Sequence, residues 1–513
     1  MGLALATCLL AAACGRLYDG DSRPPGAPDA MVEGGAAFSF SIAPLTMKPA
    51  FSPDIHDYYV RCAAGANLLT VTITAAPGGT VALEQPTTTA PATAGTSAQL
   101  SVAENQAVVV ASSLGGATTE YWVRCLPHDF PALFTKTYPE NGSVTPGYYL
   151  LGDVFFAAGE SGYAMALDTR GTPVWYAPTV NGEGAKDVEM LAPDTISFVP
   201  NAGYTFGTNE GQFEVVALSA TGVSGVSSVA SVGLPVDTHE LRQLSNGHYL
   251  VFASPVLTNV DLTGLAIFGG PSEDVLNCVI QEIDGNGALV WQWDAMDHFD
   301  PVKDSTAPDT QVATNALGQQ TTVIDLFHCN SIDVDDNGNL LVSARHMSSL
   351  FLIDKSTGAV VWKMGGSPYT KEGAPFVQLI GDSLGGFFLQ HDARFQPDGT
   401  ISVFDDQTNQ PGPARALVLS YDLSSATAAI VWQYQGTASV ASMGSVTLLA
   451  DGSRVIGWGT AGGGNPAFSE VTESGDVLLE FGFPDGDASY RARKVPTSAL
   501  DIELLRRAVA VPK

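Results

Sequence analysis

Short apolar runs that follow a turn dipeptide recur along the chain from residue 131 onwards. An Asn-Gly or Asp-Gly dipeptide precedes each run. The four clearest pairs of dipeptide and run are 246–247 with 249–252, 337–338 with 340–343, 398–399 with 401–404, and 451–452 with 455–458. Such dipeptides favour the tight turns of β-hairpins. The pattern therefore predicts short antiparallel strands rather than long helices.

A second phrase, Gly-x-x-Val-Trp or a variant of it, comes later in each repeat. It occupies 171–175, 287–291, 358–362 and 429–432. Counting the repeats gives six units: 146–180, 187–232, 237–296, 326–366, 389–436 and 441–483. Because the last three tryptophans are about 70 residues apart and a blade needs roughly 40–50, we interpret 301–322 and 367–388 as loop insertions. The fold predicted for 131–513 is an all-β, six-bladed β-propeller.

Residues 38–130 carry a different pattern, in which strand-like stretches such as 68–74 and 107–111 alternate with turns rich in Gly, Pro and Thr. This alternation is typical of a small β-sandwich. The phrase 49–58 resembles bacterial cadherin-like modules, so we expect a cadherin- or Ig-like sandwich that spaces or docks the propeller. The prolines between 127 and 131 mark the boundary.

The chain begins with an apolar run, 3–13, that ends at Cys14. The run is shorter than the about 20 residues that span a bilayer, but it fits a signal peptide. The small residues before Cys14 resemble a bacterial lipoprotein processing site, although no Lys or Arg precedes the run. We therefore expect a signal peptide at 1–14, lipidation of Cys14 and a flexible linker at 15–37; an ordinary secretory signal is the alternative. The protein is then periplasmic or anchored in the outer membrane, and it touches the membrane only through its lipid.

Four further cysteines lie beyond this leader. Cys62 and Cys125 end two segments with the shared pattern Tyr-x-Val-Arg-Cys. In an oxidising compartment a Cys62–Cys125 disulfide is the economical prediction. Cys278 and Cys329 stand in strand-like contexts, and we expect them to be buried thiols rather than a pair.

Charge narrows the function classes. The 513 residues hold 23 Lys and Arg against 53 Asp and Glu, a formal charge of −30, and only 15% of residues are charged. A nucleic-acid partner is excluded, because phosphate binding needs clustered cations. With 45% hydrophobic residues the chain is not a disordered polyacid either.

Three of the eight histidines occupy one position in the repeat. His239, His328 and His391 each open a unit, shortly before its turn dipeptide. In a propeller the innermost strand of each blade starts near the central channel, so these side chains are expected to converge on one axial pocket. Asn330 follows His328, and a hairpin would return Arg345 towards both. Imidazoles, a carboxamide and a guanidinium suit an oxyanion. The rival hypothesis is a zinc site of three histidines, but the arginine and the absence of a His-x-x-x-His spacing disfavour it.

Several phrases together resemble the bacterial arylsulfate sulfotransferases. They are 327–331 (Phe-His-Cys-Asn-Ser), 343–346 (Ser-Ala-Arg-His), 390–395 (Gln-His-Asp-Ala-Arg-Phe), 403–406 (Val-Phe-Asp-Asp) and 291–299. The resemblance covers roughly 140–495, with a divergent sequence. It implies a six-bladed propeller that moves a sulfuryl group from an aryl sulfate to a phenol without a nucleotide donor, a cofactor or a metal.

The resemblance also implies roles for single residues. His391 would be the nucleophile that becomes transiently sulfated. His328, Asn330 and Arg345 would hold the sulfuryl oxygens, and His239 would act as an acid and base or as a further sulfate contact. Fixed donors around three charged oxygens suit sulfuryl transfer as they suit phosphoryl transfer. A phenol acceptor needs a base, which His239 or His328 would supply.

Two other functions stay open at this point. One is a non-catalytic propeller lipoprotein that binds an anionic ligand or a protein partner; the other, suggested only by the blade tryptophans, is a quinone-dependent dehydrogenase. His298 and His346 are secondary candidates behind the site. We interpret 490–493 (Tyr-Arg-Ala-Arg) as a solvated turn rather than as substrate contacts. The sequence carries no signal for an oligomeric state.

Overall fold

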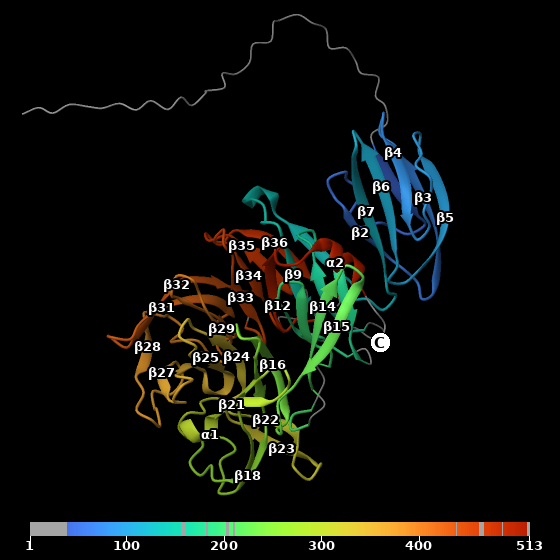
Figure 1. Ribbon diagram of the computed structural model, residues 1–513. Helices are drawn as coiled ribbons and strands as arrows, with labels where there is room; N and C mark the ends of the chain where they lie inside the picture. The colour runs from blue at the N-terminus through green and yellow to red at the C-terminus, as the bar shows by residue number, and fades with distance from the viewer. Residues whose placement is uncertain are drawn as a thin grey trace, which may run out of the picture.

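The protein is nearly all β-structure (Figure 1). The computed structural model describes residues 38–154, 161–180, 183–201, 205–208, 211–437, 439–460, 466–484 and 486–509. The expected signal peptide, Cys14 and the linker 15–37 lie outside these residues. Within them, 37 strands are accompanied by two short α-helices, α1 (Ala295–His298) and α2 (Ile502–Arg507). In the described part of the chain, neither helix has the length and apolar character that crossing a membrane requires.

The N-terminal strands form two sheets that enclose one core. In sheet order the strands are β1 (Ser39–Ala43), β3 (Ala66–Thr74) and β5 (Thr96–Ala103), and then β2 (Asp57–Arg61), β7 (Ala117–Leu126), β6 (Ala107–Leu114) and β4 (Thr80–Gln85). Along β3 every second side chain from Leu69 on is buried, as a two-layer packing requires. Val71 and Val110, one from each sheet, belong to the same apolar core. Cys62 and Cys125 form a disulfide that ties the end of β2 to β7.

Six further sheets each begin with a strand that lies against the first strand of the next sheet. From the first strand outwards they are β37 (Ala492–Pro496), β9 (Gly147–Gly152), β10 (Tyr163–Leu167) and β11 (Pro173–Pro178); β12 (Lys186–Ala192), β13 (Thr195–Val199), β14 (Phe213–Ser219) and β15 (Gly222–Val229); β16 (Val236–Gln243), β17 (Tyr249–Ala253), β20 (Val279–Ile283) and β21 (Leu289–Asp294); β24 (Cys329–Val334), β25 (Leu340–Ala344), β26 (Ser349–Ile353) and β27 (Val360–Met364); β29 (His391–Phe395), β30 (Ile401–Asp405), β31 (Arg415–Asp422) and β32 (Thr427–Gln435); and β33 (Ser445–Leu448), β34 (Arg454–Gly457), β35 (Phe468–Val471), β36 (Val477–Gly482) and β8 (Phe134–Thr137).

The first strands of these sheets follow one another around a centre. β12 lies against β16, β16 against β24, β24 against β29, β29 against β33, and β33 against β37, which lies against β12 again. We call these six the inner strands. Because each one starts its sheet, residues early in the inner strands meet at one end of the centre.

Strands from opposite ends of the chain complete two of the sheets. The unit expected at 146–180 supplies only β9, β10 and β11, and its inner strand, β37, comes from 492–496. Conversely, β8 at 134–137 adds an outer strand to β36. Both pairings are antiparallel. The early strand β8 is thus hydrogen-bonded to a late sheet, and the late strand β37 is hydrogen-bonded to an early sheet.

The two expected loop insertions contain strands. Residues 301–322 hold β22 (Asp309–Thr314) and the first half of β23 (Gln320–Asp325), which join β18 (Val256–Val260) and β19 (Glu273–Leu276) in a separate four-stranded sheet. We call this the inserted sheet. In 367–388, β28 (Phe376–Ile380) pairs in parallel with both β27 and β32 and so joins two neighbouring sheets. The expectation of plain loops was wrong, because these polar segments pair with strands far away in the sequence.

The N-terminal sheets contact the rest of the protein through α2 (Figure 1). The guanidinium of Arg506 binds the carboxylate of Asp57 at 2.8 Å, and its backbone oxygen accepts a hydrogen bond from Arg124. Beside this contact, Tyr59 and Leu126 pack into a core that also holds Tyr149 of β9. Because these apolar side chains are buried together, the N-terminal sheets pack against the rest of the protein and are not joined to it by the connecting chain alone.

Candidate active site

Three histidines lie together at the starts of neighbouring inner strands. His239 lies in β16, His328 immediately precedes β24, and His391 is the first residue of β29. The ring centroids of His239 and His328 are 4.8 Å apart. Only 2% of His391 and 7% of His239 is exposed. The three histidines occupy the same position in successive repeats, and they therefore lie close together in the structure.

Each of these histidines is held by a carboxylate through the same ring nitrogen. The pairs are His239 with Asp237, His328 with Asp325 (2.5 Å) and His391 with Asp406 (2.7 Å), in every case from Nδ1. An Nδ1–H that donates to a carboxylate leaves the Nε2 lone pair of a neutral imidazole available. The sequence analysis did not identify these partners. Asp237 and Asp325 lie close in sequence to His239 and His328, and this spacing could have identified the partners in these two pairs.

His391 has the features of a neutral nucleophile. Burial lowers the pKa of His391 well below its usual value, and the charges of Arg345, His328 and His239 lower it further. Burial also raises the pKa of its partner Asp406 well above the ordinary range, although Arg345 opposes that shift. Nε2 of His391 accepts a hydrogen bond from the backbone N–H of Met443 at 3.4 Å. The imidazole is therefore uncharged at neutral pH, and its basic nitrogen is directed away from Asp406.

His328 is also neutral at ordinary pH. Burial lowers the pKa of His328 to about 4, even though the nearby carboxylate of Asp325 favours the protonated ring. For Asp325, burial alone would raise the pKa, but His328 and His346 outweigh it and hold the pKa far below its usual value.

Arg345 returns to His328 as the hairpin spacing predicts. It begins a short turn after β25, and its backbone N–H donates to the carbonyl oxygen of His328 at 2.9 Å. Its guanidinium donates to Nε2 of His346 at 2.8 Å and to the carbonyl oxygen of Ala441 at 2.9 Å. His346 donates in turn from Nδ1 to the backbone of Asp325 at 2.8 Å. His346 therefore links the guanidinium of Arg345 to the backbone of Asp325, the residue that also binds His328.

Asn330 holds the strand that carries His391. Its amide donates to the carbonyl oxygen of Gln390 at 2.8 Å and accepts from the backbone N–H of Asp392 at 3.3 Å. The side chain therefore binds the backbone on both sides of His391 and is fully buried. This geometry differs from the expected contact with sulfuryl oxygens, because the amide is already bonded to the neighbouring strand.

Tyr490 and Arg491 lie inside the protein, where we expected a solvated turn. Each is 2% exposed. The hydroxyl of Tyr490 donates to the carbonyl oxygen of His239 at 3.1 Å. Arg491 forms ion pairs with Asp187 and with Glu240. The expectation was wrong because these residues directly precede β37, and that inner strand is invisible in a count of repeats.

An ionic network lies beside the histidines and along the inner strands. Its members are acidic and basic side chains that form ion pairs with one another, and all are buried or nearly buried. They are Asp187, Glu189, Glu240, Asp392, Arg394, Arg491 and Arg493. Paired in this way, the charges satisfy each other and leave the chemistry to the imidazoles and Arg345.

The family model described as "Arylsulfotransferase (ASST)" matches residues 216–483, more than half of the chain. The chain belongs to the arylsulfotransferase family. The match includes all three histidines, Asn330 and Arg345, whereas Tyr490 and Arg491 lie beyond it. A search of curated proteins finds no match.

Several solved structures are distantly similar to this family member. A protein of unknown function from Bacteroides caccae is 13% identical, with a TM-score of 0.37, over 68% of this chain and 99% of its own. A protein from Lactobacillus plantarum is 11% identical, with a TM-score of 0.36, over 68% and 100%. A virginiamycin B lyase from Staphylococcus aureus is 9% identical, with a TM-score of 0.31, over 68% and 88%. Scores this low carry no argument about this chain.

The zinc hypothesis does not fit the way this family member arranges its histidines. Among the described residues, two groups place possible ligand atoms within 4.8 Å of one another, Asp325 with His328 and His346, and Asp187 with Glu189 and Glu240, and neither group combines the three repeated histidines. Nε2 of His346 already accepts a hydrogen bond from the cationic Arg345. A guanidinium beside the ligands opposes a second cation there.

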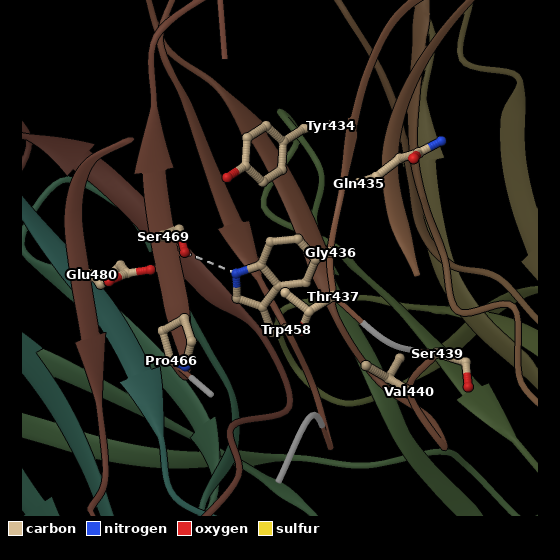
Figure 2. A pocket seen from close by; sticks show the side chains of 10 residues that line it. All are labelled: Tyr434, Gln435, Gly436, Thr437, Ser439, Val440, Trp458, Pro466, Ser469 and Glu480. Atoms are coloured by element: carbon tan, nitrogen blue, oxygen red, sulfur yellow. Dashed lines mark hydrogen bonds between the residues drawn. The ribbon is translucent and has the colours of Figure 1, made fainter. Parts of the chain in front are cut away.

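A cavity of about 100 Å³ is lined by residues of β32, β35 and β36 and of the loops beside these strands (Figure 2). Trp458 lies among its lining residues and donates from Nε1 to Ser469 at 2.9 Å. Val440 lines the cavity, and its backbone N–H donates to the carbonyl oxygen of Asp406. The described lining holds none of the three histidines.

His298 does not belong to the site. Its Nδ1 contacts Glu372 at 2.6 Å, and its ring stacks on Trp293 at 4.8 Å between centroids. These contacts stabilise α1, so His298 is a structural residue.

Proposed function

We propose that the protein is an aryl-sulfate sulfotransferase that transfers a sulfuryl group from an aryl sulfate to a phenol through a sulfo-histidine at His391, without a nucleotide donor. The observation that carries this proposal is the buried, neutral His391, with Nδ1 held by Asp406 and with the cationic Arg345 close by. Family membership supports a sulfotransferase; the geometry supplies the nucleophile.

In the first half-reaction, Nε2 of His391 attacks sulfur. An N–S bond forms with the imidazole lone pair, and the S–O bond to the aryl group breaks, so its electron pair leaves on the aryl oxygen. His239, which in the reacting state carries a proton on Nε2 as well as the Nδ1–H bound to Asp237, gives the Nε2 proton to that oxygen and becomes neutral. In the second half-reaction the acceptor phenol attacks sulfur, the N–S bond breaks towards His391, and the phenolic proton passes back to His239. Burial lowers the pKa of His328 to about 4, so His328 is a weak base at neutral pH.

Arg345 stabilises the sulfuryl oxygens in this proposal. Among the described residues, its Nε is a buried nitrogen without a hydrogen-bond partner. An unmet buried donor costs about 1–3 kcal/mol, so a bound oxyanion would compensate that cost. A neutral His328 has its Nδ1–H on Asp325 and no proton on Nε2, so in this proposal it donates to the same oxygens only when a bound sulfate ester favours its protonated form. Asn330 positions His391 from the neighbouring strand.

The fold fits this chemistry as a propeller behind a sandwich. We propose that the six sheets are the blades of a six-bladed β-propeller in 131–513, and that the two N-terminal sheets form a β-sandwich domain in 38–130. We also propose that 1–14 is a lipoprotein signal with lipidation at Cys14, and that the protein is periplasmic or attached to the outer membrane by that lipid. The two disulfides fit an oxidising, extracytoplasmic compartment.

The test uses the purified protein with 4-nitrophenyl sulfate as donor and phenol as acceptor. We expect release of 4-nitrophenol that requires phenol, and an intact-mass adduct of one SO₃ group when the acceptor is withheld. His391→Ala should abolish both. His128→Ala is the matched control, because the side chain of His128 is 54% exposed and lies outside the cluster. Anion binding with no turnover across a panel of aryl sulfates would instead support a non-catalytic binding protein.

A further inference from the structure

Lys186 occupies in β12 the position that His391 occupies in β29. Each is the first residue of its inner strand. Each pairs with the second strand of its sheet, and in both sheets the register then shifts by one residue before the pairing resumes three positions later. The residue that follows, Asp187 or Asp392, has a φ of 53° or 59°. A register shift of this kind redirects the side chains beside it, so the two strands direct Lys186 and His391 in the same way.

β12 and β29 are opposite each other among the inner strands. The strands follow one another as β12, β16, β24, β29, β33 and β37 and return to β12, so three steps separate β12 from β29 in either direction. Corresponding positions of opposite strands lie on opposite sides of the centre. Lys186 therefore stands across the centre from the proposed nucleophile, at the same end.

The surroundings of Lys186 connect it to the histidine cluster. Its side chain is buried, and Nζ lies 5.6 Å from the centroid of the Tyr490 ring. The hydroxyl of Tyr490 donates to the carbonyl oxygen of His239 at 3.1 Å. Asp237, which holds Nδ1 of His239, lies within electrostatic reach of Lys186. Lys186 is therefore a neighbour of His239 and not a residue of the outer surface.

Lys186 carries a positive charge at neutral pH. Burial lowers the pKa of Lys186 to about 8, whereas Asp237 and Asp187 oppose this shift and Arg491 adds to it. The ionisable groups on the elements around it are Asp153 after β9, Asp187 on β12, Asp237 and His239 on β16, and Tyr490 and Arg491 before β37. The ammonium is thus the main form below about pH 8, and it gives up its charge above that pH.

We propose that the ammonium of Lys186 binds the aryl oxygen on which negative charge develops as the S–O bond breaks. This inference rests on the proposed function, since it adds a catalytic residue to the same transfer. The attacking and leaving atoms of such a displacement lie in line on opposite sides of the transferred group. With Nε2 of His391 on one side of sulfur, the leaving oxygen departs towards Lys186. Lys186 transfers no proton, which His239 supplies, and it stabilises the charge on the oxygen until that proton arrives.

The test compares two donors whose leaving groups differ, in a single turnover with the acceptor withheld. Phenyl sulfate releases a phenol with a pKa near 10, whereas 4-nitrophenyl sulfate releases a more acidic phenol that needs less stabilisation. We expect Lys186→Met to slow release from phenyl sulfate about 100-fold, as loss of one fixed donor does, and release from 4-nitrophenyl sulfate much less. Lys186→Arg, which keeps a cation, should retain most of the rate with phenyl sulfate. Lys303→Met is the matched control, because the side chain of Lys303 is 57% exposed and binds Asp300.

The pH dependence gives a second readout. Since the ammonium is the stabilising form, release from phenyl sulfate by the wild-type protein should fall as the pH rises through about 8. In Lys186→Arg the guanidinium stays charged, so this fall should disappear. If Lys186→Met did not fold, this comparison would still decide, and an equal fall in the wild-type protein and in Lys186→Arg would contradict the inference.

Failure of the inference and failure of the proposed function are distinguishable. If the wild-type protein released phenol from neither donor and formed no SO₃ adduct, the proposed function would fail, and the inference with it. If Lys186→Met slowed both donors equally, Lys186 would be only a counter-ion that stabilises Asp237, and the inference would fail alone. If Lys186→Met changed neither rate, another group would stabilise the leaving oxygen, and the inference would again fail alone.

Discussion

At the scale of single residues, the chemistry depends on which nitrogen of each imidazole is occupied. Asp237, Asp325 and Asp406 each bind Nδ1, so Nε2 is the ring nitrogen left for a substrate in all three rings. Burial lowers the pKa of His391, and the charge of Arg345, whose buried Nε has no hydrogen-bond partner among the described residues, lowers it further. In the proposed reaction Arg345 therefore helps to keep His391 neutral and also attracts the anion.

This arrangement predicts an unusual pH dependence. An ordinary histidine is half protonated at about pH 6.5, but burial and Arg345 lower the pKa of His391 well below that value. His391 sulfation should therefore persist as the pH falls through 6.5, and it should be lost only when the pH reaches the lowered pKa. Arg345→Gln removes one of the charges that lower this pKa, so the acid limb should move to higher pH. The measurement is the pH profile of the single-turnover 4-nitrophenol burst at saturating donor. An acid limb at the same pH in both proteins would contradict this account of Arg345.

The residues of the site differ in how far the sequence reveals them. The position in the repeat identified His239, His328 and His391, because a propeller-like repeat returns the same position to the same place. His391 begins β29, and Asp406 comes directly after the next strand, β30. No repeated pattern in the sequence identifies Asp406 as the partner of His391. Tyr490 reaches His239 from the far end of the chain. A contact of that kind depends on how the sheets close, which no local pattern encodes.

At the scale of elements, the inserted sheet and the second disulfide connect neighbouring sheets behind the histidines. Cys278 and Cys329 are bonded to each other, and the expectation of two buried thiols was wrong. They lie 51 residues apart in strand-like surroundings, so only the packing of β20 against β24 brings them together. Cys329 stands between His328 and Asn330. The disulfide therefore fixes the start of β24, which carries Asn330 and directly follows His328.

The two disulfides provide a matched pair for a stability experiment. Replacing Cys278 and Cys329 by serine should lower the free energy of unfolding by about 4 kcal/mol, the loop entropy expected for a cross-link of this span. Replacing Cys62 and Cys125, which are 63 residues apart, should cost a similar amount. Only the first pair should also reduce turnover, because only Cys329 adjoins His328. Urea unfolding and turnover, measured at a temperature where all variants are folded, test this; equal turnover in both variants would refute the positioning role.

At the scale of the whole molecule, the formal charge of −30 describes the surface and not the centre. Cations are scarce, yet several of them, among them Arg345, Arg394 and Arg491, are buried around the inner strands. The net charge argues against a nucleic-acid partner, while Arg394 and Arg491 are paired with acidic residues along the inner strands. Net charge alone therefore does not describe the charge around the histidines.

Closure of the sheets should depend on β37. A chain that ends after residue 484 lacks β37 together with Tyr490 and Arg491, so the β9 sheet loses its inner strand, and we expect loss of cooperative unfolding and of all activity. A chain that ends after residue 499 keeps β37 but lacks α2 and its ion pair with Asp57. It should stay folded and active while its N-terminal sheets become more accessible to protease. Calorimetry and limited proteolysis of both truncations make the comparison. Activity in the shorter chain would show that β37 is dispensable.

The pairing of β37 with β9 also determines when the enzyme can exist at all. The chain is made from its N-terminus, so β9 is synthesised long before β37 is available to pair with it. The N-terminal sheets contain only early residues and can fold at once, whereas the ring of inner strands stays open until the last of them arrives. Tyr490, which binds His239, arrives with that strand. We therefore expect the proposed sulfuryl transfer to begin only after β37 has been made and has paired with β9.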